Sequence, residues 1–110
     1  MQITLRDEGD TKVVMLNGKL DTNSTPTAEA EVNKLMDDGA TKVLVNFEQI
    51  TYISSSGLRF LLATAKRLKA SGGELKVCSL NEMATEVFEL SGFSAIIGAF
   101  ATESDALGSS

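Results

Sequence analysis

The sequence contains no His and no Trp, and it has only one Cys and one Pro among its 110 residues. Without His there is neither a Ser–His or Cys–His catalytic pair nor an imidazole ligand for a metal ion. The single Cys, Cys78, has no partner for an intramolecular disulfide, which is typical of proteins in the reducing cytoplasm. The composition therefore favours a cytoplasmic protein without a metal site.

Long apolar runs are also missing. No run of about 20 apolar residues is present that could span a membrane, and the charged segment 1–10 does not resemble a signal peptide. With 43% hydrophobic and 23% charged residues, the chain has the composition of a soluble globular domain. We expect a single domain over residues 1–110, with residues 108–110 as a frayed tail.

Basic residues are absent from the C-terminal part of the chain. The formal net charge is -5, and residues 1–80 hold all ten Lys and Arg together with ten of the fifteen Asp and Glu. Because nucleic-acid binding needs cations that neutralise phosphates, an acidic residue range 81–110 argues against a nucleic-acid partner. Glu82, Glu86 and Glu89 have the spacing of the outer face of a helix.

The apolar residues that are present change their period along the chain in a regular order. Residues 2–7 alternate between apolar and polar, and residues 11–17 are rich in Val, Met and Leu, so both segments are predicted as strands. The short segment around Gly9 between them indicates a turn, and Gly18 is expected to end the second strand. These strands together predict an N-terminal β-hairpin.

The rest of the chain alternates between helix-like and strand-like segments. A helix is predicted from Pro26 to Gly39, with Ser24 or Thr25 as its N-cap, because Pro is tolerated in the first turn. The apolar run 42–47 is too short for a helix and is typical of a strand covered on both faces. The remaining predicted elements are a helix over 57–70, a strand over 75–80, a helix from Asn81 to about Ser91, a short strand over 95–98 and a helical turn over 102–107.

This order predicts an α/β fold. Strands that are separated by helices form right-handed crossovers, which place them parallel to one another in one sheet. We therefore expect a small, mostly parallel sheet of four to five strands with an N-terminal β-hairpin and about four helices.

Functional sites in such a sheet gather where loops leave the carboxyl ends of parallel strands. Three loops are expected at that edge, over residues 18–26, 48–56 and 79–81. The middle loop is the most unusual, because Ser54, Ser55 and Ser56 stand in a row before an amphipathic helix. One of these hydroxyls can cap the helix, which stabilises it by about 1 kcal/mol, and the other two are then unexplained.

The three serines leave several chemical interpretations open. A nucleophilic Ser in a small hydrolase is not favoured, because no His can act as its base and neither a G-x-S-x-G nor a Ser-x-x-Lys pattern occurs. Nucleotide-binding glycine motifs are absent as well. Phosphorylation is compatible with the pattern, because a helix N-terminus accommodates an anion and the added charge changes the surface that a partner meets.

Two segments of the sequence resemble a known family. The segment 43–62, VLVNFEQITYISSSGLRFLL, is similar to the signature of STAS domains, specifically of the stand-alone anti-sigma factor antagonists. That signature is an apolar strand ending in Asp, then several residues, then an apolar residue followed by D-S-S-G-L. The segment 18–21, GKLD, resembles the G-x-L-D that follows the second strand in the same family. The resemblance covers essentially the whole chain and implies the STAS fold.

The resemblance also implies roles for individual residues. Ser55 matches the phosphoacceptor of the family, with Ser54 and Ser56 as alternatives, and Gly57 matches the Gly that opens the helix. Asp21 matches an acidic residue close to the phosphorylation site. Two positions depart from the family pattern, because Ser54 and Asn46 stand where the family usually has Asp.

What the resemblance implies about function is partner switching. The unphosphorylated protein would bind an anti-sigma factor that is also a Ser kinase of the GHKL type, and so release a sigma factor. Phosphorylation would end this binding, and a Ser/Thr phosphatase of the PPM type would restore it. The chain itself would need no cofactor and would not be an enzyme. The alternative is a STAS regulator of a transporter, a sensor kinase or a lipid-trafficking complex.

The partner surface is expected to include residues from both loops. Arg59 would place a cation in the first helical turn, where a carboxylate or a phosphate would favour it. Phe60 lies off the stripe formed by the Leu residues of this helix, so it is a candidate anchor, although core packing is the favoured interpretation. The predicted partner-binding residues are Asp21, Thr22, Asn23, Ser24, Ser54, Ser56, Gly57, Arg59 and Phe60.

Overall fold

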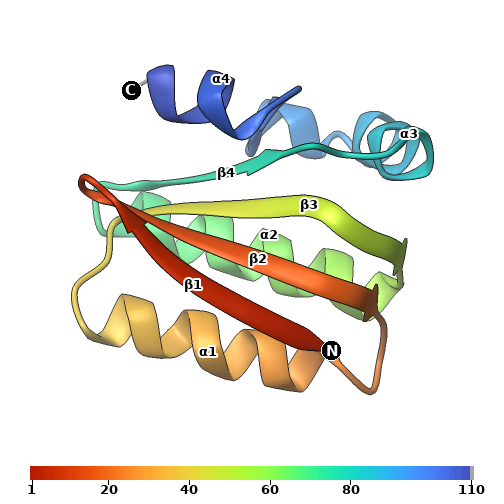
Figure 1. Cartoon of the computed structure of the whole chain (residues 1–110), viewed down its shortest axis with the longest axis horizontal. Helices are drawn as coiled ribbons and strands as arrows, with labels where there is room; N and C mark the ends of the chain where they lie inside the picture. The colour runs from red at the N-terminus through yellow and green to blue at the C-terminus, as the bar shows by residue number, and fades with distance from the viewer. Residues whose placement is uncertain (110) are drawn as a thin grey trace.

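The computed structural model describes residues 1–109 and contains one five-stranded sheet in the strand order β1-β2-β3-β4-β5 (Figure 1). Strand β1 pairs antiparallel with β2, and the other three neighbouring pairs are parallel. The predicted mostly parallel sheet with an N-terminal hairpin is therefore confirmed. The elements are β1 (Gln2–Glu8), β2 (Thr11–Leu20), α1 (Thr25–Asp37), β3 (Lys42–Ile53), α2 (Ser55–Ala70), β4 (Glu74–Cys78), α3 (Glu82–Leu90), the 3-10 turn η1 (Phe93–Ala95), β5 (Gly98–Phe100) and α4 (Glu103–Gly108).

The sheet has one extensively covered face and one sparsely covered face. Side chains of α1, α2 and α3 pack with alternate residues of β2, β3 and β4 into the main core. On the other face, Ala106 of α4 contacts a much smaller cluster formed by Val13, Leu44 and Cys78. In Figure 1, α1 and α2 lie together behind the sheet, whereas α4 lies apart from them beyond β4.

The buried face of α2 is rotated relative to the predicted stripe of leucines. Its buried residues are Gly57, Phe60, Leu61, Thr64, Ala65 and Leu68, which follow helical spacing, whereas Leu58 and Leu62 are only partly buried. Phe60 belongs to the main core and is 2% exposed. The prediction that Phe60 anchors a partner is therefore wrong, and the favoured interpretation, core packing, is correct.

Strands β2 and β3 both continue beyond their predicted ends. Strand β2 runs through Gly18 to Leu20, and β3 continues to Ile53, so residues 48–53 form a strand and not the expected loop. The pairing becomes irregular here, because Gly18 lies opposite Ile50 and the next residue of β2 lies opposite Tyr52. Gly18 has φ +118, which suits this irregular register and is a conformation that other residues rarely adopt.

The helix caps agree with the sequence in most places. Asn81 caps α3 by accepting the Ala84 N–H at 2.8 Å, as predicted, and the three acidic residues of that helix are exposed. Ser24 occupies the N-cap position of α1, but its side chain does not cap this helix. Its hydroxyl forms hydrogen bonds in the preceding loop instead.

The C-terminal strands are shifted relative to their predicted bounds. Strand β4 ends at Cys78, because Ser79 has φ +60 and donates its N–H to the Phe100 carbonyl. Strand β5 lies over Gly98–Phe100 instead of residues 95–98, since Phe93–Ala95 form the 3-10 turn.

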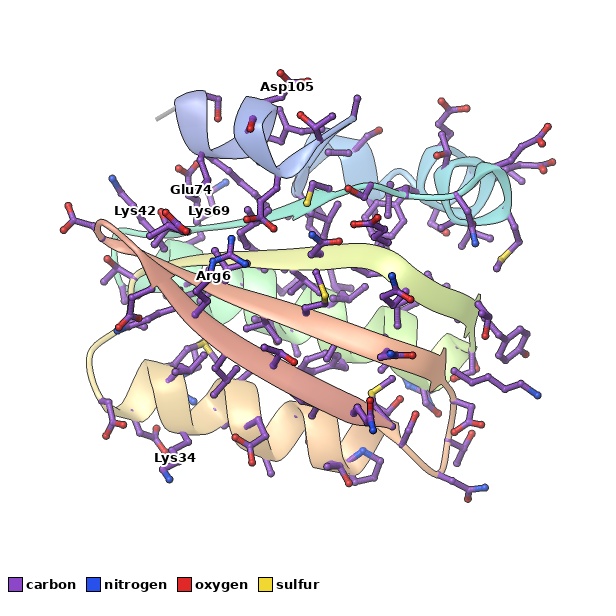
Figure 2. The ribbon with its side chains drawn as sticks, viewed as in Figure 1. Arg6, Lys34, Lys42, Lys69, Glu74 and Asp105 are labelled. Atoms are coloured by element: carbon purple, nitrogen blue, oxygen red, sulfur yellow. The ribbon has the colours of Figure 1, made fainter. Side chains whose placement is uncertain are left out.

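Helix α4 is held by four polar side chains, Arg6, Asn46, Lys76 and Glu103, which we call the α4 anchor. Arg6 of β1 forms an ion pair with Glu103, and the Asn46 amide donates from Nδ2 to Glu103 Oε2 at 2.9 Å. Lys76 Nζ donates to the Ala106 carbonyl at 3.1 Å. Figure 2 shows Arg6 on the side of the sheet that faces α4.

Residues 108 and 109 do not form the predicted frayed tail. Gly108 is the last residue of α4, and the Ser109 hydroxyl accepts a hydrogen bond from Lys76 Nζ at 2.7 Å. Ser110 lies outside the described residues.

Candidate functional site

The carboxyl ends of β2 and β3 lie side by side with the N-terminal ends of α1 and α2, at the right-hand edge of Figure 1. The Ser54 N–H donates to the Leu20 carbonyl at 2.8 Å and joins the two chain segments. A Cβ at Gly57 would lie 2.9 Å from Leu20 Cγ, so Gly allows the first turn of α2 to approach β2 closely. We call this region, residues 21–24 and 52–59, the carboxyl edge.

The three consecutive serines have three different environments. Ser54 is the N-cap of α2 and accepts the Gly57 N–H at 3.2 Å. The Ser56 hydroxyl lies 3.4 Å from the Thr22 hydroxyl and accepts from Arg59 Nη2 at 3.3 Å. Ser55 is exposed, and its hydroxyl has no hydrogen-bond partner among residues 1–109. The expectation that one serine caps the helix is confirmed, and Ser54 is that serine.

The loop between β2 and α1 is held together by Asp21 and Ser24. Asp21 Oδ1 accepts the backbone N–H groups of Asn23 and Ser24, both at 3.0 Å. The Ser24 hydroxyl donates to the Lys19 carbonyl at 2.5 Å and accepts the Asp21 N–H at 3.0 Å. The Ser24 hydroxyl thus forms its hydrogen bonds within the loop, which explains why it does not cap α1.

Asp21 carries a stabilised negative charge in this loop. The hydrogen bond from the Ser24 backbone, followed by that from Asn23, holds the pKa of the Asp21 carboxyl below its usual value, although desolvation opposes the shift. An open hollow of about 400 Å³ lies against the same loop. It is lined by Met1, Lys19, Asp21, Asn23, Ser24 and Thr27.

Tyr52 is a candidate site residue that the sequence reasoning missed. It lies at the end of β3, next to the serines, and is 48% exposed, which makes it one of the few large exposed apolar side chains. The irregular pairing turns Tyr52 outward while Ile50 and Ile53 on either side are buried. Alternation of apolar residues does not reveal such a position, because the strand does not keep its regular period here.

The structure brings together most of the predicted site residues but not all of them. Asp21, Thr22, Asn23 and the three serines share one edge of the sheet with Arg59. Gly57 and Phe60 are buried and present no side chain to a partner. Gly57 acts instead through the close packing of α2 on β2.

The Ser55 hydroxyl is accessible, and no side chain among residues 1–109 forms a hydrogen bond with it. Within residues 1–109 no cluster of three Cys, Asp or Glu side chains is placed to hold a metal ion. In the same range, no helix is long and apolar enough to cross a membrane.

Comparisons with known proteins agree with this architecture. The sequence model of the STAS domain matches residues 2–106. The chain is 35% identical over 96 residues to BtrV of Bordetella bronchiseptica, a candidate anti-sigma factor antagonist, covering 87% of this chain and 83% of that protein. It is 29% identical over 79 residues to the anti-sigma-B factor antagonist of Staphylococcus aureus, covering 72% and 73% of the two chains.

Solved structures give the same result. The unphosphorylated form of the anti-sigma factor antagonist SpoIIAA superimposes with a TM-score of 0.82 at 27% identity, covering 96% of this chain and 93% of that one. The phosphorylated form of SpoIIAA from Bacillus superimposes with a TM-score of 0.78 at the same identity, covering 97% of both chains. The chain therefore belongs to the STAS domain family, among the anti-sigma factor antagonists.

Proposed function

We propose that the carboxyl edge binds an anti-sigma factor while Ser55 is unphosphorylated, and that phosphorylation of Ser55 ends this binding. The observation that carries the proposal is the difference between the three serines. Ser54 caps α2 and Ser56 contacts two side chains, whereas the Ser55 hydroxyl is exposed and has no hydrogen-bond partner among residues 1–109. A kinase can therefore phosphorylate Ser55 without disrupting the N-cap of α2.

The partner surface that we propose comprises exposed and half-buried residues of the carboxyl edge. It keeps the predicted residues that reach the surface and adds the aromatic ring of Tyr52, because exposed aromatic side chains often anchor protein interfaces. The proposed residues are Asp21, Thr22, Asn23, Ser24, Tyr52, Ser54, Ser56 and Arg59.

The proposed switch acts through charge. A phosphate on Ser55 adds about 1.5 to 2 negative charges at the first residue of α2, where the helix dipole favours an anion, so the helix remains folded. The bound partner, however, would have to desolvate this new charge or accommodate it. Truncating or adding a charge inside an interface typically changes the binding free energy by about 2–5 kcal/mol.

The identities of the kinase and the phosphatase are part of the same proposal. The anti-sigma factor would itself be the kinase, of the GHKL type, and would hold the ATP and Mg²⁺. Ser55 Oγ forms a bond to the γ-phosphorus while the bond from that phosphorus to the bridging oxygen breaks, ADP leaves, and the hydroxyl proton passes to a base of the kinase. A PPM-type phosphatase would then hydrolyse the phosphoserine.

On this proposal the chain has no catalytic role of its own and requires no cofactor. It would act in the cytoplasm, where a single thiol such as that of Cys78 stays reduced. The alternative of a regulator of a transporter, a sensor kinase or a lipid-trafficking complex is not favoured, because the named relatives are anti-sigma factor antagonists.

The test uses the full-length protein and the anti-sigma factor that co-purifies with it from its native cells. After incubation with ATP and Mg²⁺, we expect one phosphate per chain, and peptide mapping by mass spectrometry should place it on Ser55. The Ser55→Ala variant should accept none, whereas the matched Ser91→Ala variant, at an exposed serine outside the carboxyl edge, should still be phosphorylated. A phosphate that persists in Ser55→Ala, or is lost in Ser91→Ala, would contradict the site.

A further inference from the structure

Arg59 differs from the other two arginines in what it contacts. Arg6 pairs with Glu8 and Glu103, and Arg67 pairs with Asp37 at 2.6 Å. Arg59 forms no ion pair with any carboxylate of residues 1–109, and its hydrogen-bond partner is the Ser56 hydroxyl. Arg59 is thus an exposed guanidinium without a counter-ion.

The position of Arg59 on α2 places it within reach of Ser55. Both residues belong to α2 and are four apart, and residues four apart lie on the same face of a helix. Arg59 Nη2 already lies 3.3 Å from the hydroxyl of Ser56, which is three residues away. An anion four residues before a cation is the favourable order for a helical ion pair.

We propose that Arg59 is the counter-ion of the phosphate on Ser55, so that phosphorylation moves the guanidinium from the Ser56 hydroxyl onto the phosphate. This inference rests on the proposed function, because it requires a phosphate at Ser55. A guanidinium binds a phosphate through two parallel hydrogen bonds and more strongly than it binds a neutral hydroxyl. Phosphorylation would therefore add a negative charge and, in the same step, withdraw Arg59 from the partner.

Two other charged side chains, those of Asp21 and Lys19, lie at or beside the carboxyl edge. The Asp21 carboxylate is an anion, and its Oδ1 accepts two backbone N–H groups in its own loop. Lys19, on β2, is exposed and lies against that loop. Both groups stay in place when Arg59 is changed, so a substitution at Arg59 isolates its contribution.

The test requires neither the kinase nor the anti-sigma factor. Phosphoserine is incorporated at position 55 during translation, and the phosphate is titrated by phosphorus NMR in the wild-type sequence and in Arg59→Gln. A nearby cation favours the dianion, so the second pKa of the phosphate should be lower with Arg59 than without it. We expect the second acid dissociation constant to fall about threefold in Arg59→Gln, as for an exposed ion pair.

Two further variants complete the measurement. Lys66→Gln removes the same charge from an exposed position of α2 about 16 Å along the helix from Ser55, and should leave the titration unchanged. Arg59→Lys keeps the charge without the two parallel hydrogen bonds and should lie between wild type and Arg59→Gln. Circular dichroism checks that each variant is folded.

The outcomes separate this inference from the function on which it rests. Superimposable titrations of wild type and Arg59→Gln, or an equal change in Lys66→Gln, would overturn the role of Arg59, even if a kinase phosphorylates Ser55. A kinase that ignores Ser55 would contradict the proposed function, whatever the titration of the incorporated phosphoserine shows.

Discussion

The α4 anchor and the carboxyl edge are both polar, but their groups are paired differently. In the α4 anchor, Glu103 accepts from Arg6 and Asn46, and Lys76 donates to the end of the helix. At the carboxyl edge, the Ser55 hydroxyl is free and Arg59 has no carboxylate partner among the described residues. Polar groups that are satisfied internally hold an element in place, whereas unsatisfied surface groups remain available to a partner.

This difference predicts which measurement each region should affect. Changes in the α4 anchor should lower the free energy of unfolding, because its small apolar cluster contributes little alone. Changes at the carboxyl edge should alter partner affinity and leave stability nearly unchanged. The following variants test that separation.

The largest expected effect is that of a charge at Ser55 on partner binding. Ser55→Asp should weaken binding of the anti-sigma factor about 30-fold or more, because about 2 kcal/mol or more is needed to place a carboxylate in the interface. Ser55→Ala should bind as wild type does. Isothermal titration calorimetry would measure both, with Asp105→Asn on α4 as a charge change far from the site. Equal affinities of the two Ser55 variants would contradict the charge mechanism.

The second effect concerns the α4 anchor. Asn46 is 2% exposed, donates to Glu103 and accepts the Glu48 N–H at 2.8 Å. Asn46→Asp would replace the donor with a second carboxylate facing Glu103, so the free energy of unfolding should fall by about 2–4 kcal/mol in urea titrations at pH 7.

The pH dependence of Asn46→Asp gives a further check. Protonation of either carboxylate relieves their repulsion. The difference in the free energy of unfolding between wild type and Asn46→Asp should therefore become smaller as the pH falls toward 4. Asn17→Asp, an exposed Asn on β2, is the matched control and should change stability by less than about 0.5 kcal/mol. A deficit of similar size in Asn17→Asp would show that the Glu103 contact is not the cause.

Two aromatic residues show why the sequence predicted the fold better than the site. The element order followed from apolar periodicity, because helices and strands of this sheet each bury a regular face. Apolar periodicity could not predict which of Phe60 and Tyr52 is buried and which is exposed. Phe60 packs in the core because the buried face of α2 is centred between the leucines, and Tyr52 faces outward because β3 pairs irregularly with β2.

The polar contacts were also beyond the reach of sequence patterns. Capping predicted that one of three serines would be engaged, but it did not identify Ser54 as that serine, and it could not reveal that Ser56 lies beside Thr22, 34 positions away. Asn46 and Glu103 are 57 positions apart, and no local pattern links them. Such contacts depend on how the elements pack, which the sequence expresses only through the complete fold.

The third effect tests the exposed aromatic ring. Tyr52→Ala should weaken partner binding about 10-fold, as expected for an aromatic anchor, with less than about 1 kcal/mol change in stability. Leu90→Ala on α3, which removes another exposed apolar side chain, should leave affinity unchanged. Fluorescence anisotropy with labelled partner would compare them. If Leu90→Ala weakens binding as much as Tyr52→Ala does, the interface extends beyond the carboxyl edge.

The smallest expected effect is the contribution of the Asp21 charge to the stability of the carboxyl edge. The folded-state pKa of Asp21 lies below its ordinary value of 3.8, chiefly because the Ser24 backbone donates to the charged carboxylate. A depressed pKa contributes stability above the ordinary value, and this stability is lost as the pH falls through the folded-state pKa. Wild type should therefore be slightly more stable than Asp21→Asn at pH 7, and the difference should shrink in urea titrations as the pH falls below 3.8 and through the folded-state pKa. A difference that does not shrink as the pH falls below 3.8 would mean that the shape of the loop, and not the charge of Asp21, stabilises this edge.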